Sequence, residues 1–179
     1  MNICVFGAAS DRIHPEYIEA GERLGQEMAR RGHTLVFGAG ATGMMGAVSR
    51  GVHAEGGTLI GISPRFFDDA VLGLDCTELI FTETMRQRKQ KMEELADAFV
   101  TLPGSIGTLE EFFEILVLKQ LDRHQKPIFL LNTRGFFNGL VGELKHLQEE
   151  NFLGPTGLTL FTCFDDPIAL LDALEAEIR

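Results

Sequence analysis

The feature that most constrains the fold is a regular alternation of short apolar runs with longer segments of helical periodicity. Seven short runs, bounded by Gly, Pro or polar residues, are predicted to be strands: 2–6, 34–37, 58–62, 78–82, 98–102, 128–131 and 160–164. Six longer segments are predicted to be helices: 15–31, 44–54, 85–96, 108–121, 136–150 and 167–178. This order is typical of βαβ units, which build a mainly parallel sheet with helices on both faces. Because no repeat or linker divides the chain, we predict a single doubly wound α/β domain over residues 1–179.

The charge balance excludes several classes of function. The chain carries 26 Asp and Glu against 16 Lys and Arg, a formal net charge of −10. Most of such a surface would repel a nucleic acid or an anionic membrane, and no apolar stretch approaches the roughly 18 to 20 residues that span a bilayer. Neither the three cysteines nor the five histidines have metal-ligand spacing. We predict a cytoplasmic protein without a metal, a nucleic-acid partner or a membrane partner, with its histidines at the surface or at helix caps.

Ligands of doubly wound folds bind beyond the carboxyl ends of the strands, which directs attention to the loop Gly38–Gly43. Its sequence, GAGATG, has the G-x-G-x-x-G pattern. A dinucleotide site would place this pattern in the first βα turn, with an acidic residue about 20 positions later, but position 63 is Ser. Two alternatives stay open, a turn that serves only packing and a loop whose backbone approaches a phosphate. Gly40 and Gly43, with Ser10 of the first turn, are the candidate phosphate-binding residues here.

The loop after the run 98–102 is a second candidate phosphate site. It reads Pro103-Gly104-Ser105-Ile106-Gly107-Thr108, in which proline ends the strand and Thr108 is expected to cap the next helix. The first N–H groups of that helix would then point at the cleft, where a phosphate fits. An ordinary strand-to-helix turn with a Thr cap explains the same residues.

Two charged residues and a carboxylate favour a site over a simple turn. In the predicted helix 85–96, Arg88 and Lys89 fall in the middle of the apolar stripe. A charge that points into the core needs a carboxylate, a phosphate or water as its partner. Glu111 heads an apolar row of the next helix, whereas Glu110 and Glu114 share a face that can meet solvent. The alternative is a purely structural ion pair between Arg88 and Glu111.

Two motifs in register resemble a known family. The segments Met85-Arg86-Gln87-Arg88-Lys89 and Pro103–Glu111 are similar to the MxxRK and PGGxGTxxE motifs of the LONELY GUY (LOG) family. The resemblance implies a Rossmann-like fold and a homodimer. It also implies hydrolysis of the N-glycosidic bond of a purine nucleoside 5′-monophosphate, either AMP or a cytokinin nucleotide, to the free base and ribose 5-phosphate. It implies no cofactor.

Carried over position by position, the resemblance makes Arg88 and Glu111 the catalytic residues. The other motif positions are expected to bind the substrate and its phosphate: Met85, Lys89, Gly104, Ser105, Ile106, Gly107 and Thr108. Members of the family have carried a lysine decarboxylase label, but no lysine stands out here as a Schiff-base site.

The chain also departs from the family pattern. Ser105 replaces the second glycine of PGG, and Ala8, Ala9 and Ala39 replace Ser, Ser and Gly. These changes bear on substrate identity more than on fold. The rival interpretation is a non-catalytic nucleotide-binding protein, such as a molybdenum-cofactor carrier, which shares the phosphate turn but does not need the Arg88 and Glu111 pair. The segment 64–75 is predicted to be a lid or a subunit contact, with core packing as the more ordinary use of its phenylalanines.

Overall fold

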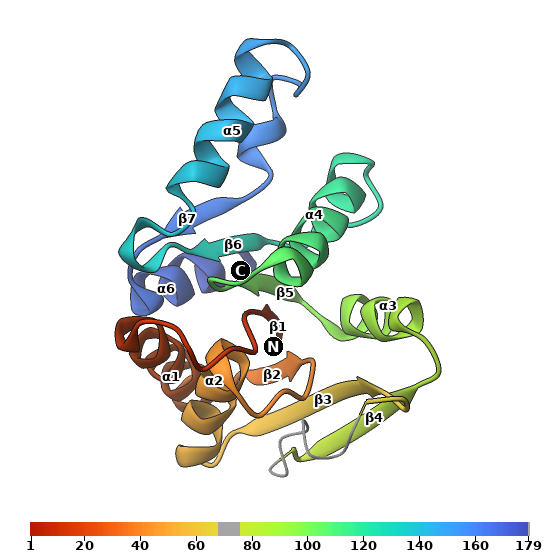
Figure 1. The fold of residues 1–179 in the computed structure, drawn as a ribbon, viewed down its shortest axis with the longest axis vertical. Coiled ribbons are helices and arrows are strands. Elements are labelled where there is room, and N and C mark those ends of the chain that lie inside the picture. The colour runs from red at the N-terminus through yellow and green to blue at the C-terminus, as the bar shows by residue number, and fades with distance from the viewer. Residues whose placement is uncertain (68–75, 179) are drawn as a thin grey trace.

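A single parallel sheet forms the centre of the molecule (Figure 1). The structure is a computed structural model that describes residues 1–67 and 76–178, so most of the segment 64–75 lies outside the described residues. The seven strands lie in the order β4-β3-β2-β1-β5-β6-β7, and each neighbouring pair is parallel. Their bounds are β1 Asn2–Phe6, β2 Thr34–Phe37, β3 Thr58–Pro64, β4 Glu78–Thr82, β5 Ala98–Thr101, β6 Ile128–Leu131 and β7 Thr162–Phe164. The predicted doubly wound α/β fold is confirmed.

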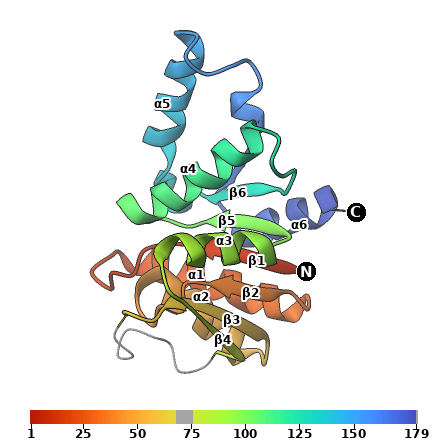
Figure 2. The same cartoon turned by 90° about the vertical axis from the view of Figure 1, so that its right-hand side faces the viewer.

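The described part of the chain contains six α-helices. They lie on the two faces of the sheet (Figures 1 and 2). Their bounds are α1 Pro15–Arg30, α2 Gly43–Ala54, α3 Met85–Leu95, α4 Ile106–Gln120, α5 Asn138–Glu149 and α6 Pro167–Ile178. Helices α1, α2 and α6 share one apolar cluster with the sheet, and α3, α4 and α5 share the other. Alternate residues of each central strand point to opposite faces, so Ile3 and Val5 enter the first cluster and Cys4 and Phe6 the second.

Several predicted element boundaries differ from the structure by one or two residues; β3, for example, ends at Pro64 rather than at 62. Helix α4 begins at Ile106 rather than at Thr108, because Ser105 is extended and forms its N-cap position, which places Thr108 inside the first turn. The prediction that Thr108 caps this helix is therefore wrong. Helix α5 begins at Asn138, after a separate 3-10 turn at Thr133–Gly135, and β7 begins at Thr162 because another 3-10 turn occupies Gly157–Thr159.

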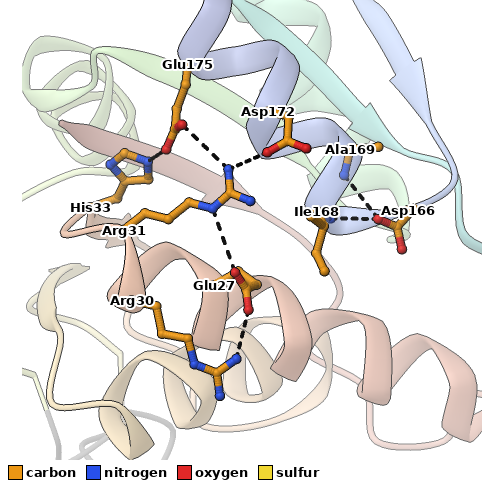
Figure 3. A network of polar contacts seen from close by, with 9 residues as sticks. All are labelled: Glu27, Arg30, Arg31, His33, Asp166, Ile168, Ala169, Asp172 and Glu175. Atoms are coloured by element: carbon orange, nitrogen blue, oxygen red, sulfur yellow. Dashed lines mark hydrogen bonds and ion pairs between the residues drawn. The ribbon is translucent and has the colours of Figure 1, made fainter.

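A network of charged groups fixes α6 to the end of α1 (Figure 3). Arg31 lies 2.8 Å from Asp172 and 3.6 Å from Glu175, and it also faces Glu27 at 3.7 Å. The Nε2 atom of His33 lies 2.9 Å from Glu175, and His33 is buried. The prediction of histidines at the surface or at caps holds for His14, the N-cap residue of α1, and fails for His33.

Candidate active site

Arg88 lies where three elements meet at the carboxyl edge of the sheet. Thr84 caps α3 by accepting a hydrogen bond from the Gln87 amide, which starts the helix and presents Arg88 in its first turn. The side chain is buried and crosses the ends of β2 and β3. Its Nε donates to the Ile62 carbonyl at 3.1 Å, and its Nη1 donates to Glu111 Oε1 at 3.0 Å. The sequence predicts that Arg88 points into the core and needs a partner, and the structure confirms both: Arg88 is buried and pairs with the Glu111 carboxylate.

Glu111 reaches Arg88 from the second turn of α4. Only 14% of its side chain is exposed, against 6% for Arg88. Burial raises the pKa of the Glu111 carboxyl above its ordinary value, and the Arg88 charge lowers it by less than burial raises it. The buried thiol of Cys4 in β1 interacts electrostatically with both residues of this pair, and burial first and the Glu111 charge second raise its pKa. The site therefore holds a carboxyl group that can exchange a proton closer to neutral pH than an exposed glutamate can.

Lys89 lies beside Arg88 but faces α4. It forms ion pairs with Glu110 and, at 2.6 Å, with Glu114. Burial lowers the pKa of Lys89, but the two glutamates outweigh that effect and raise it overall, so the amine stays charged. Adjacent helix positions differ by about 100°, and for this reason Arg88 points to the sheet edge and Lys89 to the neighbouring helix. Met85, at the start of α3, is 38% exposed.

The turn before α4 offers unpaired backbone donors. Among the described residues, nothing accepts a hydrogen bond from the N–H groups of Ile106, Gly107 or Thr108. Gly104 lets the turn close tightly, because a Cβ on it would lie 2.7 Å from the Thr108 Cγ2. The turn is tied to the first loop, since the Ala8 amide donates to the Pro103 carbonyl at 3.1 Å. A helix amino terminus with free N–H groups at a sheet edge is a general anion site.

In the loop Gly38–Gly43 and at the start of α2, backbone amides already donate hydrogen bonds to other groups of the chain. The Gly43 amide donates to Asp11 Oδ1 at 2.7 Å, and the Met45 amide donates to the Ala8 carbonyl at 3.3 Å. The amino end of α2 thus has a carboxylate of its own, which competes with any phosphate that Gly40 and Gly43 were predicted to bind. Gly43 has a φ of 62°, and a Cβ there would lie 2.7 Å from the Ser10 amide, so glycine is required at this position.

A pocket of about 370 Å³ opens beside the α4 turn. Its walls are residues 8–10 of the first loop, residues 103–105, and the side chains of Ile13, Tyr17 and Phe136. The rings of Tyr17 and Phe136 meet edge to face, with centroids 5.9 Å apart. Ser10 lies at this pocket, and so do three of the departures from the family pattern, Ala8, Ala9 and Ser105. The fourth, Ala39, is buried elsewhere with a φ of 59°.

Sequence reasoning missed three contributors to the site. Gly38 lies directly under the Arg88 guanidinium, Ile62 supplies a backbone acceptor, and Asp11 caps α2. The literal G-x-G-x-x-G pattern marked Gly38, but nothing in it showed that an arginine fifty positions later would lie there. Within residues 1–67 and 76–178, no group of three His, Cys, Asp or Glu side chains could hold a metal, and no helix could cross a membrane.

The fold and the site together define a class. A doubly wound parallel sheet whose carboxyl edge carries an Arg–Glu pair and an open helix amino terminus is a Rossmann-like protein. Comparison with known families gives the particular one. Residues 45–174 match the family described as "Possible lysine decarboxylase", and the chain belongs to this family, the LOG family.

The relatives in sequence cover nearly the whole chain. Cytokinin riboside 5′-monophosphate phosphoribohydrolase LOG5 of Arabidopsis thaliana is 37% identical over 175 residues, which are 97% of this chain and 77% of the relative. The cytokinin riboside 5′-monophosphate phosphoribohydrolase of Mycobacterium marinum is 39% identical over 175 residues, covering 97% of this chain and 91% of the relative.

Solved structures give the same fold. The molybdenum cofactor binding protein of Rippkaea orientalis superposes with a TM-score of 0.75 at 22% identity, covering 99% of this chain and 97% of its own. The molybdenum cofactor carrier protein of Chlamydomonas reinhardtii has a TM-score of 0.74 at 22% identity, with 98% of each chain covered. At this level of identity the likeness concerns the fold alone.

Proposed function

We propose that this protein hydrolyses the N-glycosidic bond of a purine nucleoside 5′-monophosphate, AMP or its cytokinin-type derivative, to the free base and ribose 5-phosphate. The observation that carries the proposal is the largely buried pair of Arg88 and Glu111, 3.0 Å apart. Arg88 comes from α3, whereas Glu111 lies on α4, the helix whose first turn holds the open amides of Ile106, Gly107 and Thr108. The names of the sequence relatives support the same reaction.

The chemistry follows from the bond that breaks. Cleavage between C1′ and the base nitrogen develops positive charge on the ribose, which a nearby carboxylate stabilises. In the proposed reaction Glu111 faces that charge and accepts a proton from the attacking water, whose oxygen bonds to C1′ as the electron pair of the broken bond leaves with the base. The base then takes up a proton. A glutamate whose pKa is raised by burial suits both accepting and returning a proton.

Arg88 and the α4 turn have supporting roles in this proposal. The guanidinium holds the Glu111 carboxylate in one orientation. Its positive charge also stabilises the ionised form of this largely buried carboxylate. The amides of the turn hold the 5′-phosphate, so that binding energy from a non-reacting group positions the sugar. Lys89 is held by ion pairs with Glu110 and Glu114 of α4, so the structure gives it no feature of a Schiff-base lysine.

A homodimer is part of the same proposal. The outer side of α4 exposes a stripe of apolar side chains: Ile106, Phe113, Val117 and Leu121. We propose that a second copy of the chain covers this stripe, since contiguous exposed apolar surface commonly marks an interface. Light scattering of the wild type and of Val117→Glu tests it. A dimer that Val117→Glu converts to monomer supports the proposal, and a monomeric wild type at micromolar concentration contradicts it.

The second candidate is a nucleotide or molybdenum-cofactor carrier without turnover. The observation in its favour is the structural likeness to molybdenum-cofactor binding proteins over almost the whole chain. A carrier needs the phosphate turn and a pocket, but it gains nothing from an arginine that orients a buried glutamate. Catalysis is thus the better explanation of Arg88 and Glu111.

The decisive experiment measures base release. Purified wild type, Glu111→Gln and the control Glu143→Gln, which alters an exposed glutamate of α5, are incubated with AMP and with N6-isopentenyl-AMP. Free base is quantified by chromatography. Release by the wild type and the control, with a loss of at least about 100-fold in Glu111→Gln, supports the hydrolase. Saturable nucleotide binding without release from any variant supports the carrier instead.

A further inference from the structure

Position 38 is filled by the Arg88 guanidinium. Gly38 follows β2 directly and is buried. A Cβ on this residue would overlap Nη2 of Arg88 and lie 3.0 Å from its Cζ. The next nearest atom is Met45 Sδ at 3.5 Å, an ordinary contact distance. The space that any other residue would need for its side chain is thus occupied by one functional group of one arginine.

The opposite sides of the guanidinium are held by hydrogen bonds. Nε donates to the Ile62 carbonyl on β3, and Nη1 donates to Glu111 on α4. A planar guanidinium has its donors in a fixed fork, so a push from position 38 cannot be absorbed without lengthening one of these two bonds. The group is therefore located by two hydrogen bonds and one steric boundary, each from a different element.

Backbone conformation does not explain the glycine. Gly43, in the same loop, has a φ of 62°, whereas the φ of Gly38 lies outside the left-handed region. An alanine is therefore compatible with the backbone at position 38, and what glycine provides there is room.

We propose that Gly38 is a positioning residue, whose missing side chain sets the place of the Arg88 guanidinium and thereby the contact of Nη1 with Glu111. Its consequence for turnover rests on the proposed hydrolase function, but the positioning itself does not. Four groups affect the charge state of Glu111 or share its surroundings: Arg88 and Lys89 of α3, Glu110 of α4 and Cys4 of β1. Of these, Gly38 contacts Arg88.

The test is a double-mutant cycle of Gly38→Ala and Arg88→Ala. Gly139→Ala is the control, because a Cβ at that position of α5 meets nothing within 4 Å. The Glu111 carboxyl is titrated by carbon-13 NMR in protein with labelled glutamate, and its signal is assigned with Glu111→Gln. Thermal unfolding and base release are measured on the same samples.

We expect Gly38→Ala to fold, since the atoms it displaces are the far end of a flexible side chain. The pKa of Glu111 should rise further, because Arg88 lowers it in the wild type, and kcat should fall at least about tenfold with a smaller change in KM. In the Arg88→Ala background, Gly38→Ala should change neither the titration nor the residual rate. Gly139→Ala should behave as wild type.

Two results overturn the proposal. One is a Gly38→Ala protein that titrates and turns over as wild type does, because the arginine then keeps its place without the glycine. The other is an equal effect of Gly38→Ala with and without Arg88, because the residue then acts through the loop. The NMR titration needs no turnover, so a protein without nucleosidase activity that shows the predicted cycle refutes the hydrolase and leaves the positioning role intact.

Discussion

Removing Arg88 should destabilise the protein in a way that depends on pH. Arg88→Ala deletes two hydrogen bonds from a buried charged donor, to Ile62 and to Glu111, and each such bond contributes about 1.5 kcal/mol or more. It also leaves a largely buried carboxylate without its counter-ion. Breaking a buried pair in this way typically costs about 3–5 kcal/mol. Because 14% of the Glu111 side chain stays exposed, we expect the lower end, about 3 kcal/mol at pH 7.5.

The sign of the pH dependence follows from the Glu111 carboxyl. Without Arg88 its pKa in the folded protein rises further above the unfolded value. The loss of folding free energy from burying ionised Glu111 is then at its full value above the folded pKa, and it vanishes below the unfolded pKa of about 4.3. The stability deficit of Arg88→Ala should therefore shrink as the pH falls from 7.5 towards 5.

Far-ultraviolet circular dichroism is a suitable probe of both urea and thermal unfolding, because the chain has no Trp and only one Tyr to report by fluorescence. At pH 7.5 the midpoint of thermal unfolding should fall by about 6–12 °C, from roughly 2–4 °C per kcal/mol in a chain of this size. Arg88→Ala combined with Glu111→Gln should recover part of the loss. A variant as stable as wild type, or a deficit that grows in acid, would refute the reasoning.

Three further predictions concern other contacts. Asp11→Ala removes the carboxylate from the Gly43 amide and should lower the free energy of unfolding by about 1 kcal/mol, as loss of an N-cap does; urea titration measures this, and an unchanged midpoint contradicts the capping role. Lys89→Met breaks the contacts of α3 with Glu110 and Glu114, and its loss of about 1 kcal/mol should be smaller in high salt; a loss that ignores salt would point to packing instead. Burial, partly offset by Glu175, lowers the pKa of His33, so stability should decline as pH falls from the unfolded value of about 6.5 through the folded one. His33→Gln should flatten this part of the stability profile, and an unaltered slope would exclude His33 as its source.

The sequence predicted the sheet well because each strand is a short apolar run closed by glycine, proline or a polar residue, and such runs admit few alternatives. The start of α4 was predicted two residues late, because Ser105 and Thr108 are both good N-cap residues and Gly107 suggested a turn. Local preference could not decide between them. Packing of Thr108 against Gly104 inside the first turn does decide.

The candidate site was only partly predictable for a similar reason. Helical periodicity showed that Arg88 points inward, and a charge that points inward requires a partner, so Glu111 was a sound expectation. Lys89 was placed on the same stripe, although a single helix position turns it towards α4. Gly38 and Asp11 owe their roles to neighbours in space that lie 50 and 32 positions away along the chain. No periodicity in one segment contains that information.

The hydrogen bond between Arg88 and Glu111 also joins two consecutive segments of the chain. Everything up to α3, with strands β1 to β4, precedes the short connection at residues 96–97, and α4 with strands β5 to β7 follows it. The first segment holds the arginine and its seat on β2 and β3, while the second holds the glutamate and the open amides. Neither segment contains a complete site. A chimaera that exchanges one segment for that of a relative must keep both the guanidinium and the carboxylate in contact, so this single contact tests whether two halves are compatible.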